Sequence, residues 1–205
     1  GFDRENLYFE VDKPTDKLRF LIEYIKKNPE SSGIVYCLTR KTVESVCEKL
    51  NKEGIKATRY HAGLSDSERA VNQEEFIYDR VKIIVATNSF GMGIDKSDIR
   101  FVIHYNMPKT MENYYQEAGR AGRDGERADC ILMFSAADTV MNRLLIENSG
   151  AGTDRTNDYK KLQEMVDYCN TDSCLRRYIL SYFGELYVSE KCDNCGNCTN
   201  DIECT

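Results

Sequence analysis

Two arginines stand three residues apart in the glycine-rich segment QEAGRAGRDG (116–125). On a helix or helical turn, the spacing of Arg120 and Arg123 directs both side chains the same way. A guanidinium group makes forked hydrogen bonds to phosphate or carboxylate groups, so such a pair typically binds an anion. The segment therefore predicts an anion site, and a nucleotide bound there would need further groups to hold its phosphates.

No phosphate-binding loop accompanies these arginines in the sequence. The nearest match to the pattern G-x4-G-K-[ST] is GMGIDKS (91–97), in which Asp95 takes the place of the second Gly and would repel phosphate. The dinucleotide-binding pattern G-x-G-x-x-G fails at Lys96. This turn nevertheless follows a predicted buried strand, and ligands of open α/β sheets bind at the carboxyl ends of strands. A structural turn with Asp95 as a local cap is the alternative interpretation.

A cysteine cluster is the second chemical feature. The segment CDNCGNC places Cys192, Cys195 and Cys198 at successive x2 spacings, which can direct three sulfurs at one metal ion. Tetrahedral Zn²⁺ needs a fourth ligand, for which Cys174, Cys169 and Cys204 are candidates. We expect Cys174, because it opens a predicted helix whose dipole favours a thiolate, and Cys169 is the alternative.

Two other interpretations of the cluster compete with zinc. The thiols could be surface groups or disulfides, but three cysteines in a segment with little core are more typical of a metal site. A ferredoxin-type iron–sulfur run would need a fourth Cys where Ile202 stands, followed by Pro. We therefore expect about one structural zinc ion per chain, since four sulfurs leave no open position for chemistry.

The composition limits the kinds of partner. The chain has 205 residues, a net charge of −6 and nine cysteines, most of them after residue 168. A protein that holds nucleic acid with a broad cationic surface would be basic, so any nucleic-acid contact should involve a few placed groups. No apolar run approaches the length of a membrane span and no signal peptide is evident, so no membrane partner is expected.

From about residue 13 to residue 147, the sequence predicts strands that alternate with helices, and the two arginines and the glycine-rich turn lie within this range. Residues 18–25 and 43–50 have the i, i+3, i+4, i+7 spacing of amphipathic helices, and Ser65 with Glu68 forms a possible capping box. Further helices are predicted at 66–78, 110–119 and 136–148, and strands at 33–38, 56–60, 81–87, 100–105 and 130–134. Because the strands are apolar rather than alternating, we expect an α/β fold with a parallel sheet covered by helices on both faces.

The segment ENSGAGTDRTND (147–158) interrupts this pattern and indicates a linker. Helical stripes over 162–169 and 175–182 then lead to the cysteine cluster. A unit of about 47 residues is too small to be stable without a staple such as a metal ion. The predicted organisation is a lobe over 13–148, a linker over 149–158 and a small helical zinc-binding subdomain over 159–205.

Four segments in this order resemble the later motifs of superfamily 2 helicases: GIVYCLTRK, YHAGL, IIVATNSFGMGIDKSDIRFVIHY and YYQEAGRAGRDG. The form FGMGIDK, followed by CLRRYILSYFGE and the cysteine cluster, resembles the RecQ family of ATP-dependent DNA helicases. The resemblance runs from Phe2 to about Cys198. It includes FDRENL (2–7), which is similar to the segment that enters the second motor lobe in that family.

The resemblance implies a second RecA-like lobe followed by the zinc-binding subdomain, with residues 1–12 entering from a first lobe. In the family, ATP lies between two lobes, and the first lobe carries the phosphate-binding loop and the groups that bind Mg²⁺. ATP and Mg²⁺ are therefore expected only together with that first lobe, and this chain alone is not expected to hydrolyse ATP.

The resemblance also assigns roles by position. Arg123 is expected as the arginine finger that reaches the γ-phosphate, with Arg120 beside it and Gln116 orienting it. Gly93 and Asp95 match the motif that couples nucleotide to DNA. The single-strand track is expected to include five residues: Thr39, Arg40, His61, Thr87 and Ser89.

Alternatives for these residues come from ordinary side-chain chemistry. Either arginine could instead form an ion pair with Glu117, Asp124 or Glu126. His61 could be a histidine whose hydrogen bonds are satisfied within a turn.

The function implied by the resemblance is 3′-to-5′ DNA unwinding, with single-stranded and forked DNA as partners. The location would be the nucleoid-containing cytoplasm of a bacterium or the nucleus of a eukaryote. A zinc-containing module that binds DNA or protein without enzymatic activity is the alternative function, and an upstream phosphate-binding lobe would distinguish the two.

Overall fold

The computed structural model describes residues 1–150 and 154–200. Its centre is a six-stranded sheet in the order β1-β6-β5-β2-β4-β3, in which every pair of neighbouring strands is parallel. The strands are β1 (Leu7–Asp12), β2 (Gly33–Tyr36), β3 (Ala57–Tyr60), β4 (Ile83–Ala86), β5 (Phe101–His104) and β6 (Ala128–Met133). The predicted RecA-like α/β fold is confirmed.

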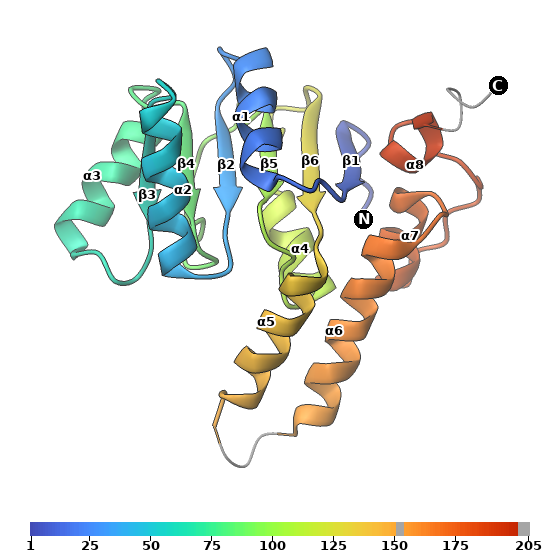
Figure 1. Ribbon diagram of the computed structural model, residues 1–205. Coiled ribbons are helices and arrows are strands. Elements are labelled where there is room, and N and C mark those ends of the chain that lie inside the picture. Colours follow the sequence, from blue (N-terminus) through green and yellow to red (C-terminus); the bar gives the residue numbers. More distant parts are fainter. Residues whose placement is uncertain (151–153, 201–205) are drawn as a thin grey trace.

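Helices follow most of the strands along the chain (Figure 1). They are α1 (Lys17–Lys27), α2 (Arg40–Lys52), α3 (Asp66–Ile77), α4 (Met111–Ala118), α5 (Ala136–Glu147), α6 (Arg155–Asn170), α7 (Leu175–Tyr182) and α8 (Gly196–Thr199). Among the residues that the structure describes, no helix combines the length and apolar character that crossing a membrane requires.

Both faces of the central strands are buried, which explains their continuous apolar sequences. Successive residues point to opposite faces, so Ile34 and Tyr36 enter one core while Val35 enters the other. Helices α1 and α2 cover the second face with residues such as Leu21 and Leu50. The first face is covered by α3 and α4 together with the helices that follow the lobe.

Strand β1 was not predicted from the sequence. It pairs with β6 along its whole length and forms one edge of the sheet. Leu7 and Phe9 point into the first core, while the other residues of the strand are only half-buried. The segment before residue 13 is therefore an integral part of the sheet.

Helices α5 and α6 form a pair that extends beyond the carboxyl ends of the strands (Figure 1). Helix α6 begins at Arg155, inside the segment 149–158 that the sequence suggested as a linker. Asp154 caps this helix through a bond from the backbone N–H of Thr156 to its carboxylate. Residues 151–153 of the predicted linker lie outside the described residues.

The helices after the lobe share its core instead of forming a separate one. Leu162, Met165, Leu175 and Ile179 belong to the same apolar cluster as Leu7 of β1. Figure 1 shows α7 and α8 beside β1, and both contact it. The small subdomain thus gains a core from the sheet edge as well as from its cysteine cluster.

Candidate metal, nucleotide and nucleic-acid sites

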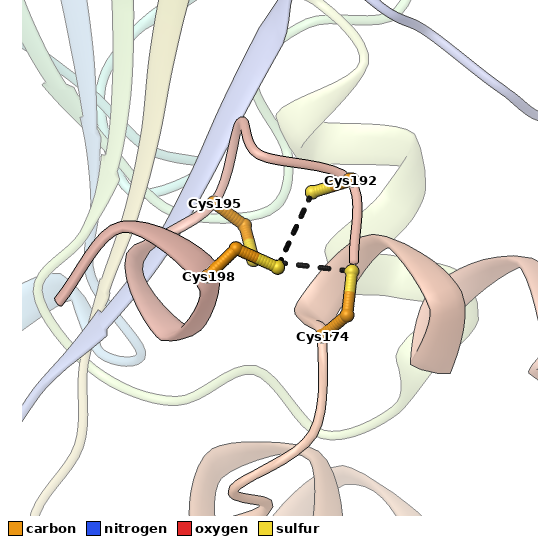
Figure 2. Close-up of side chains that lie close together, drawn as sticks. All are labelled: Cys174, Cys192, Cys195 and Cys198. Carbon is orange, nitrogen blue, oxygen red and sulfur yellow. Dashed lines mark hydrogen bonds between the residues drawn. The ribbon is translucent and has the colours of Figure 1, made fainter. Parts of the chain in front are cut away.

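The structure brings together the four predicted zinc ligands (Figure 2). Their sulfur atoms all lie within 4.8 Å of one another, with 3.9 Å between Cys192 and Cys198 and 4.0 Å between Cys174 and Cys195. A tetrahedral ion with Zn–S bonds of about 2.3 Å requires sulfur–sulfur distances of about 3.8 Å. The four-cysteine cluster therefore fits a closed, structural zinc site.

Backbone amides support thiolate character at this cluster. The N–H groups of Leu175 and Asn194 lie 3.4 Å and 3.3 Å from the sulfurs of Cys195 and Cys192. A hydrogen bond from the Cys192 thiol and bonds from backbone N–H groups outweigh burial and lower the pKa of Cys195. The hydrogen bond to Cys195 and burial raise the pKa of Cys192, and burial raises the pKa of Cys198, so the surroundings favour the metal-binding thiolate form at Cys195 but not at these two.

The alternative fourth ligands do not join the cluster. Cys169 is buried in α6 within the apolar core, and burial raises the pKa of its thiol. It is not among the four clustered sulfurs, so its role in this structure is packing. Cys204 lies outside the described residues.

Arg120 and Arg123 lie in the turn that follows α4. Arg120 is buried and donates to the carbonyl of Gly91, while Arg123 is exposed and its Nη1 lies 3.3 Å from the carbonyl of Ile94. The structure thus places both arginines against the glycine-rich turn after β4. Gly91 has a φ of 122°, and a Cβ atom there would overlap the Arg120 guanidinium, so this close approach requires glycine.

Two of the three carboxylates considered as local partners of these arginines, Glu117 and Asp124, have other partners. Glu117 accepts from His104 at 3.1 Å, and Asp124 accepts from Arg100 at 2.6 Å. Neither Arg120 nor Arg123 forms an ion pair within residues 1–150 and 154–200. The guanidinium groups contact the backbone carbonyls of Gly91 and Ile94, and that of Arg120 also hydrogen-bonds the Tyr36 hydroxyl. Among the described residues, no carboxylate compensates either positive charge.

The other predicted nucleotide-site residues lie close by in the chain. Gly93 and Asp95 are exposed in the same turn, and Gln116 is exposed on α4. Lys96 is different: it is buried and forms ion pairs with Asp79 at 2.9 Å and Asp98 at 3.0 Å. This lysine therefore stabilises the turn and does not act as a phosphate ligand.

The five predicted track residues share one edge of the sheet. Tyr36, Ala86 and Tyr60 are register partners at the carboxyl ends of β2, β4 and β3. The track residues follow directly after these ends, so the parallel topology gathers them. Arg40 and Ser89 are exposed, while Thr39 and Thr87 are more covered.

Two threonine hydroxyls at this edge are already engaged. Thr39 caps α2 by accepting from the backbone N–H of Thr42 at 3.2 Å. The hydroxyl of Thr87 lies 3.0 Å from that of Ser89. Groups that can meet a ligand here are the Arg40 guanidinium, the Ser89 hydroxyl and the amino end of the thirteen-residue helix α2.

His61 is a histidine with satisfied hydrogen bonds, as in the alternative interpretation. Its Nδ1 accepts from the backbone N–H of Gly63 at 3.0 Å, so Nε2 carries the proton and donates to Glu44 at 2.7 Å. The ring is buried and offers no free nitrogen to a ligand. It holds the turn after β3 against α2.

A cavity of about 220 Å³ opens at the same edge, between the ends of β2 and β5. It borders the track near Asn88 and contains the buried pair His104 and Glu117. This cavity adds a hollow, lined by both apolar and polar side chains, to the edge where the predicted sites meet.

Arg4 and Asn6 are further residues at these sites, and sequence patterns did not reveal them. The Arg4 guanidinium contacts the carbonyls of residues 119, 121 and 122, and Asn6 contacts those of 122 and 126. The partners are more than a hundred residues away, so no local spacing could indicate them. The only signal was the resemblance of FDRENL to a helicase segment.

Comparisons with known proteins agree with this geometry. The family model described as helicase conserved C-terminal domain matches residues 16–125, and the one described as RecQ zinc-binding matches residues 136–199. ATP-dependent DNA helicase RecQ of Bacillus subtilis is 52% identical over 98% of this chain and 34% of that protein. RecQ-like DNA helicase BLM of Xenopus laevis is 44% identical over 95% of this chain and 16% of that protein.

Solved structures show the same fold. Yeast Dbp5 bound to RNA and ADP BeF3 has a TM-score of 0.61 at 22% identity, covering 78% of this chain and 46% of that one. A DEAD box protein from Methanococcus jannaschii has a TM-score of 0.60 at 26% identity, covering 72% of this chain and 40% of that one.

The chain spans about a third of the length of the Bacillus relative. The helicase model covers more than half of the 205 residues, and the zinc-binding model covers most of the rest, including the four clustered cysteines. The chain therefore belongs to the RecQ family of helicases, of which it carries the helicase C-terminal domain and the zinc-binding domain.

Proposed function

We propose that this chain supplies one half of the ATP site and part of the single-strand track of an ATP-dependent 3′-to-5′ DNA helicase. The observation that carries the proposal is the pair Arg120 and Arg123, held against the turn 91–94 without carboxylate partners. Two uncompensated guanidinium groups suit a polyphosphate, yet this chain has no phosphate-binding loop. A first RecA-like lobe that binds ATP and Mg²⁺ would complete the site.

Arg123 is the residue we assign to the γ-phosphate. It is exposed, so its side chain can leave the Ile94 carbonyl and reach a phosphate on the facing lobe. A guanidinium placed there neutralises charge that develops during phosphoryl transfer, an effect of order 10³ or more in rate. The buried Arg120 instead fixes the turn, while Gln116 and Asp95 lie at the exposed rim of the same site.

Single-stranded DNA would follow the edge formed by the ends of β2, β4 and β3. Arg40, Ser89 and the amino end of α2 would bind backbone phosphates, with Thr39 and Thr87 shaping the surface. A few such contacts agree with a chain of net charge −6. His61 would support this surface through Glu44. Forked DNA is the proposed substrate, and the compartment would be the one that holds chromosomal DNA.

A chimera tests the proposal directly. This chain would replace the matching segment of the Bacillus subtilis RecQ protein, and DNA-stimulated ATP hydrolysis and unwinding would be measured. The Arg123→Ala chimera should lose ATPase activity by about 10³-fold while its affinity for a labelled ATP analogue changes little. Arg127→Ala is the matched control, because Arg127 is exposed in the same region and its guanidinium contacts the ring of Tyr8 and the carboxylate of Asp129. Its backbone carbonyl, which the substitution keeps, accepts from Arg100.

Normal turnover in the Arg123→Ala chimera would refute the assigned role. An inactive parent chimera that is folded and zinc-loaded would count against the helicase function and favour the binding-module alternative. Fluorescence anisotropy with single-stranded DNA at several salt concentrations would then show whether this chain binds phosphates by itself.

A further inference from the structure

The loop that carries the two arginines is held from the N-terminal end of the chain. We call residues 119–126 the arginine loop and residues 2–7 the N-terminal segment. Arg4 Nη1 donates to the carbonyl of Gly119 at 3.0 Å, and its Nη2 donates to the carbonyls of Ala121 at 2.9 Å and Gly122 at 3.2 Å. One guanidinium thus binds three carbonyls that flank Arg120 and Arg123.

Asn6 extends this contact along the arginine loop. Its amide Nδ2 donates to the carbonyls of Gly122 at 2.7 Å and Glu126 at 2.8 Å. Gly122 has a φ of 56°, and a Cβ atom there would lie 2.6 Å from the Asn6 amide. The close approach of Asn6 is therefore a second reason, besides the positive φ, why this position is glycine.

The N-terminal segment is itself fixed at several points. The Phe2 ring stacks on Phe183, and the Tyr115 hydroxyl donates to the Phe2 carbonyl at 2.7 Å. The buried Arg176 binds Asp3 and the carbonyls of Arg4 and Leu7. Arg4 therefore extends from a fixed backbone and can impose a conformation on the arginine loop.

The geometry separates two sides of the arginine loop. Its carbonyls at 119, 121 and 122 face Arg4, whereas the side chains of Arg120 and Arg123 face the turn 91–94. We propose that Arg4 is a positioning residue for Arg120 and Arg123, keeping them directed at the nucleotide. This inference rests on the proposed function for its catalytic consequence, but the positioning itself concerns only this chain.

Hydrogen exchange of backbone amides in the zinc-loaded chain tests the positioning. In Arg4→Ala, amides of the arginine loop should exchange about tenfold faster or more, because three charge-assisted hydrogen bonds are lost. Amides of β5 should change less than about twofold. Arg4→Lys should restore part of the protection, since an ammonium group keeps the charge but not the fork.

Tyr24→Phe is the control for a general loss of stability. It removes the 2.6 Å hydrogen bond from Tyr24 to Asp129, and neither residue belongs to the arginine loop. In Tyr24→Phe, the ratio of the exchange rate of arginine-loop amides to that of β5 amides should be no higher than in the unchanged chain. Unchanged loop exchange in Arg4→Ala, or equally faster exchange throughout the sheet, would overturn the proposal.

The catalytic consequence is measured in the chimera. Arg4→Ala should lower kcat of the ATPase by about tenfold or more while KM for ATP stays within about twofold, because a misdirected arginine loses transition-state contacts. A normal kcat together with a loosened loop would overturn the catalytic consequence. If the parent chimera lacks ATPase activity, the proposed function fails, while hydrogen exchange still decides whether Arg4 positions the arginine loop.

Discussion

Arg176 should contribute far more to stability than its neighbour Arg177. Arg176 is 4% exposed, and its guanidinium lies over the Phe9 ring. It donates to the carbonyls of Arg4, Leu7 and Asn194 and to the carboxylate of Asp3. It therefore joins the zinc-binding domain to the edge strand β1 and to the N-terminal segment.

The size of the effect follows from the charged hydrogen bonds that are lost. Arg176→Ala removes one donor from each of three backbone carbonyls, and a hydrogen bond from a charged group contributes about 1.5–3 kcal/mol. The carbonyls of Arg4 and Leu7 keep other donors, the Leu7 N–H and the Asn194 amide. Water that enters the space left by the side chain offsets part of this cost, so we expect the free energy of unfolding to fall by about 3–5 kcal/mol. In a chain of this size that loss lowers the melting temperature by roughly 10 °C. Arg177 is exposed on the same helix, so Arg177→Ala should change stability by less than about 0.5 kcal/mol.

Urea unfolding followed by circular dichroism, with excess Zn²⁺ present, would measure both variants. Zinc content should remain at about one ion per chain in both, because no ligand is altered. The reasoning would be refuted if the free energy of unfolding of Arg176→Ala were less than about 1 kcal/mol below that of Arg177→Ala. The buried contacts would then make no net contribution to stability.

Three further predictions concern the metal site, the arginine loop and the edge of the sheet. Cys174→Ala should lose bound zinc, whereas Cys169→Ala should retain it, as metal analysis of the purified proteins would show; zinc retained in Cys174→Ala would point to another fourth ligand. Gly122→Ala should destabilise the fold by about 1–2 kcal/mol more than Gly125→Ala, because both have positive φ but only position 122 lacks space for a methyl group. Equal melting temperatures would contradict this. Burial raises the pKa of Glu44, but hydrogen bonds from the neighbouring histidine and arginine outweigh it and lower the pKa below its usual 4.5. The unchanged chain should therefore be more stable than Glu44→Gln at neutral pH, and this advantage should shrink as the pH falls through the lowered pKa of the folded state; an advantage in urea unfolding that did not shrink at all between about pH 5 and about pH 3 would refute the assignment.

Local patterns predicted much of the lobe. The runs GIVY, IIVA and FVIH are apolar apart from the Tyr and His that end the first and the third, and each is a strand buried on both faces. The capping pattern at Ser65 and Glu68 also begins a helix, with Ser65 accepting from the backbone N–H of Glu68. These features succeed because they depend on neighbours within a few residues.

Strand β1 and the start of α6 were harder to predict. The segment LYFEVD mixes apolar and acidic residues, and it becomes a strand because β6, more than a hundred residues later, offers a free edge. Residues 155–158 are polar and show no helical pattern of their own. They are helical because they begin α6, whose later apolar residues pack on the lobe core. Tertiary packing overrides a weak local pattern in both cases.

The candidate metal site was likewise predicted in part from local spacing and in part only from the fold. The spacing of Cys192, Cys195 and Cys198 indicated a metal ion by itself, because a short turn places such sulfurs together wherever it occurs. For the fourth ligand the sequence favoured Cys174 over Cys169, and the fold places Cys174 in the cluster while it buries Cys169 in the core.

By itself the sequence determined the residue types that can do chemistry and the strands whose carboxyl ends present them. Only the tertiary structure decided which groups are free to act. It directs Arg120 and Arg123 to the turn 91–94, satisfies His61 with Glu44 and binds the arginine loop to Arg4. The physical reason is that a hydrogen bond depends on distance and direction in space, which sequence spacing specifies only within one helix, strand or turn.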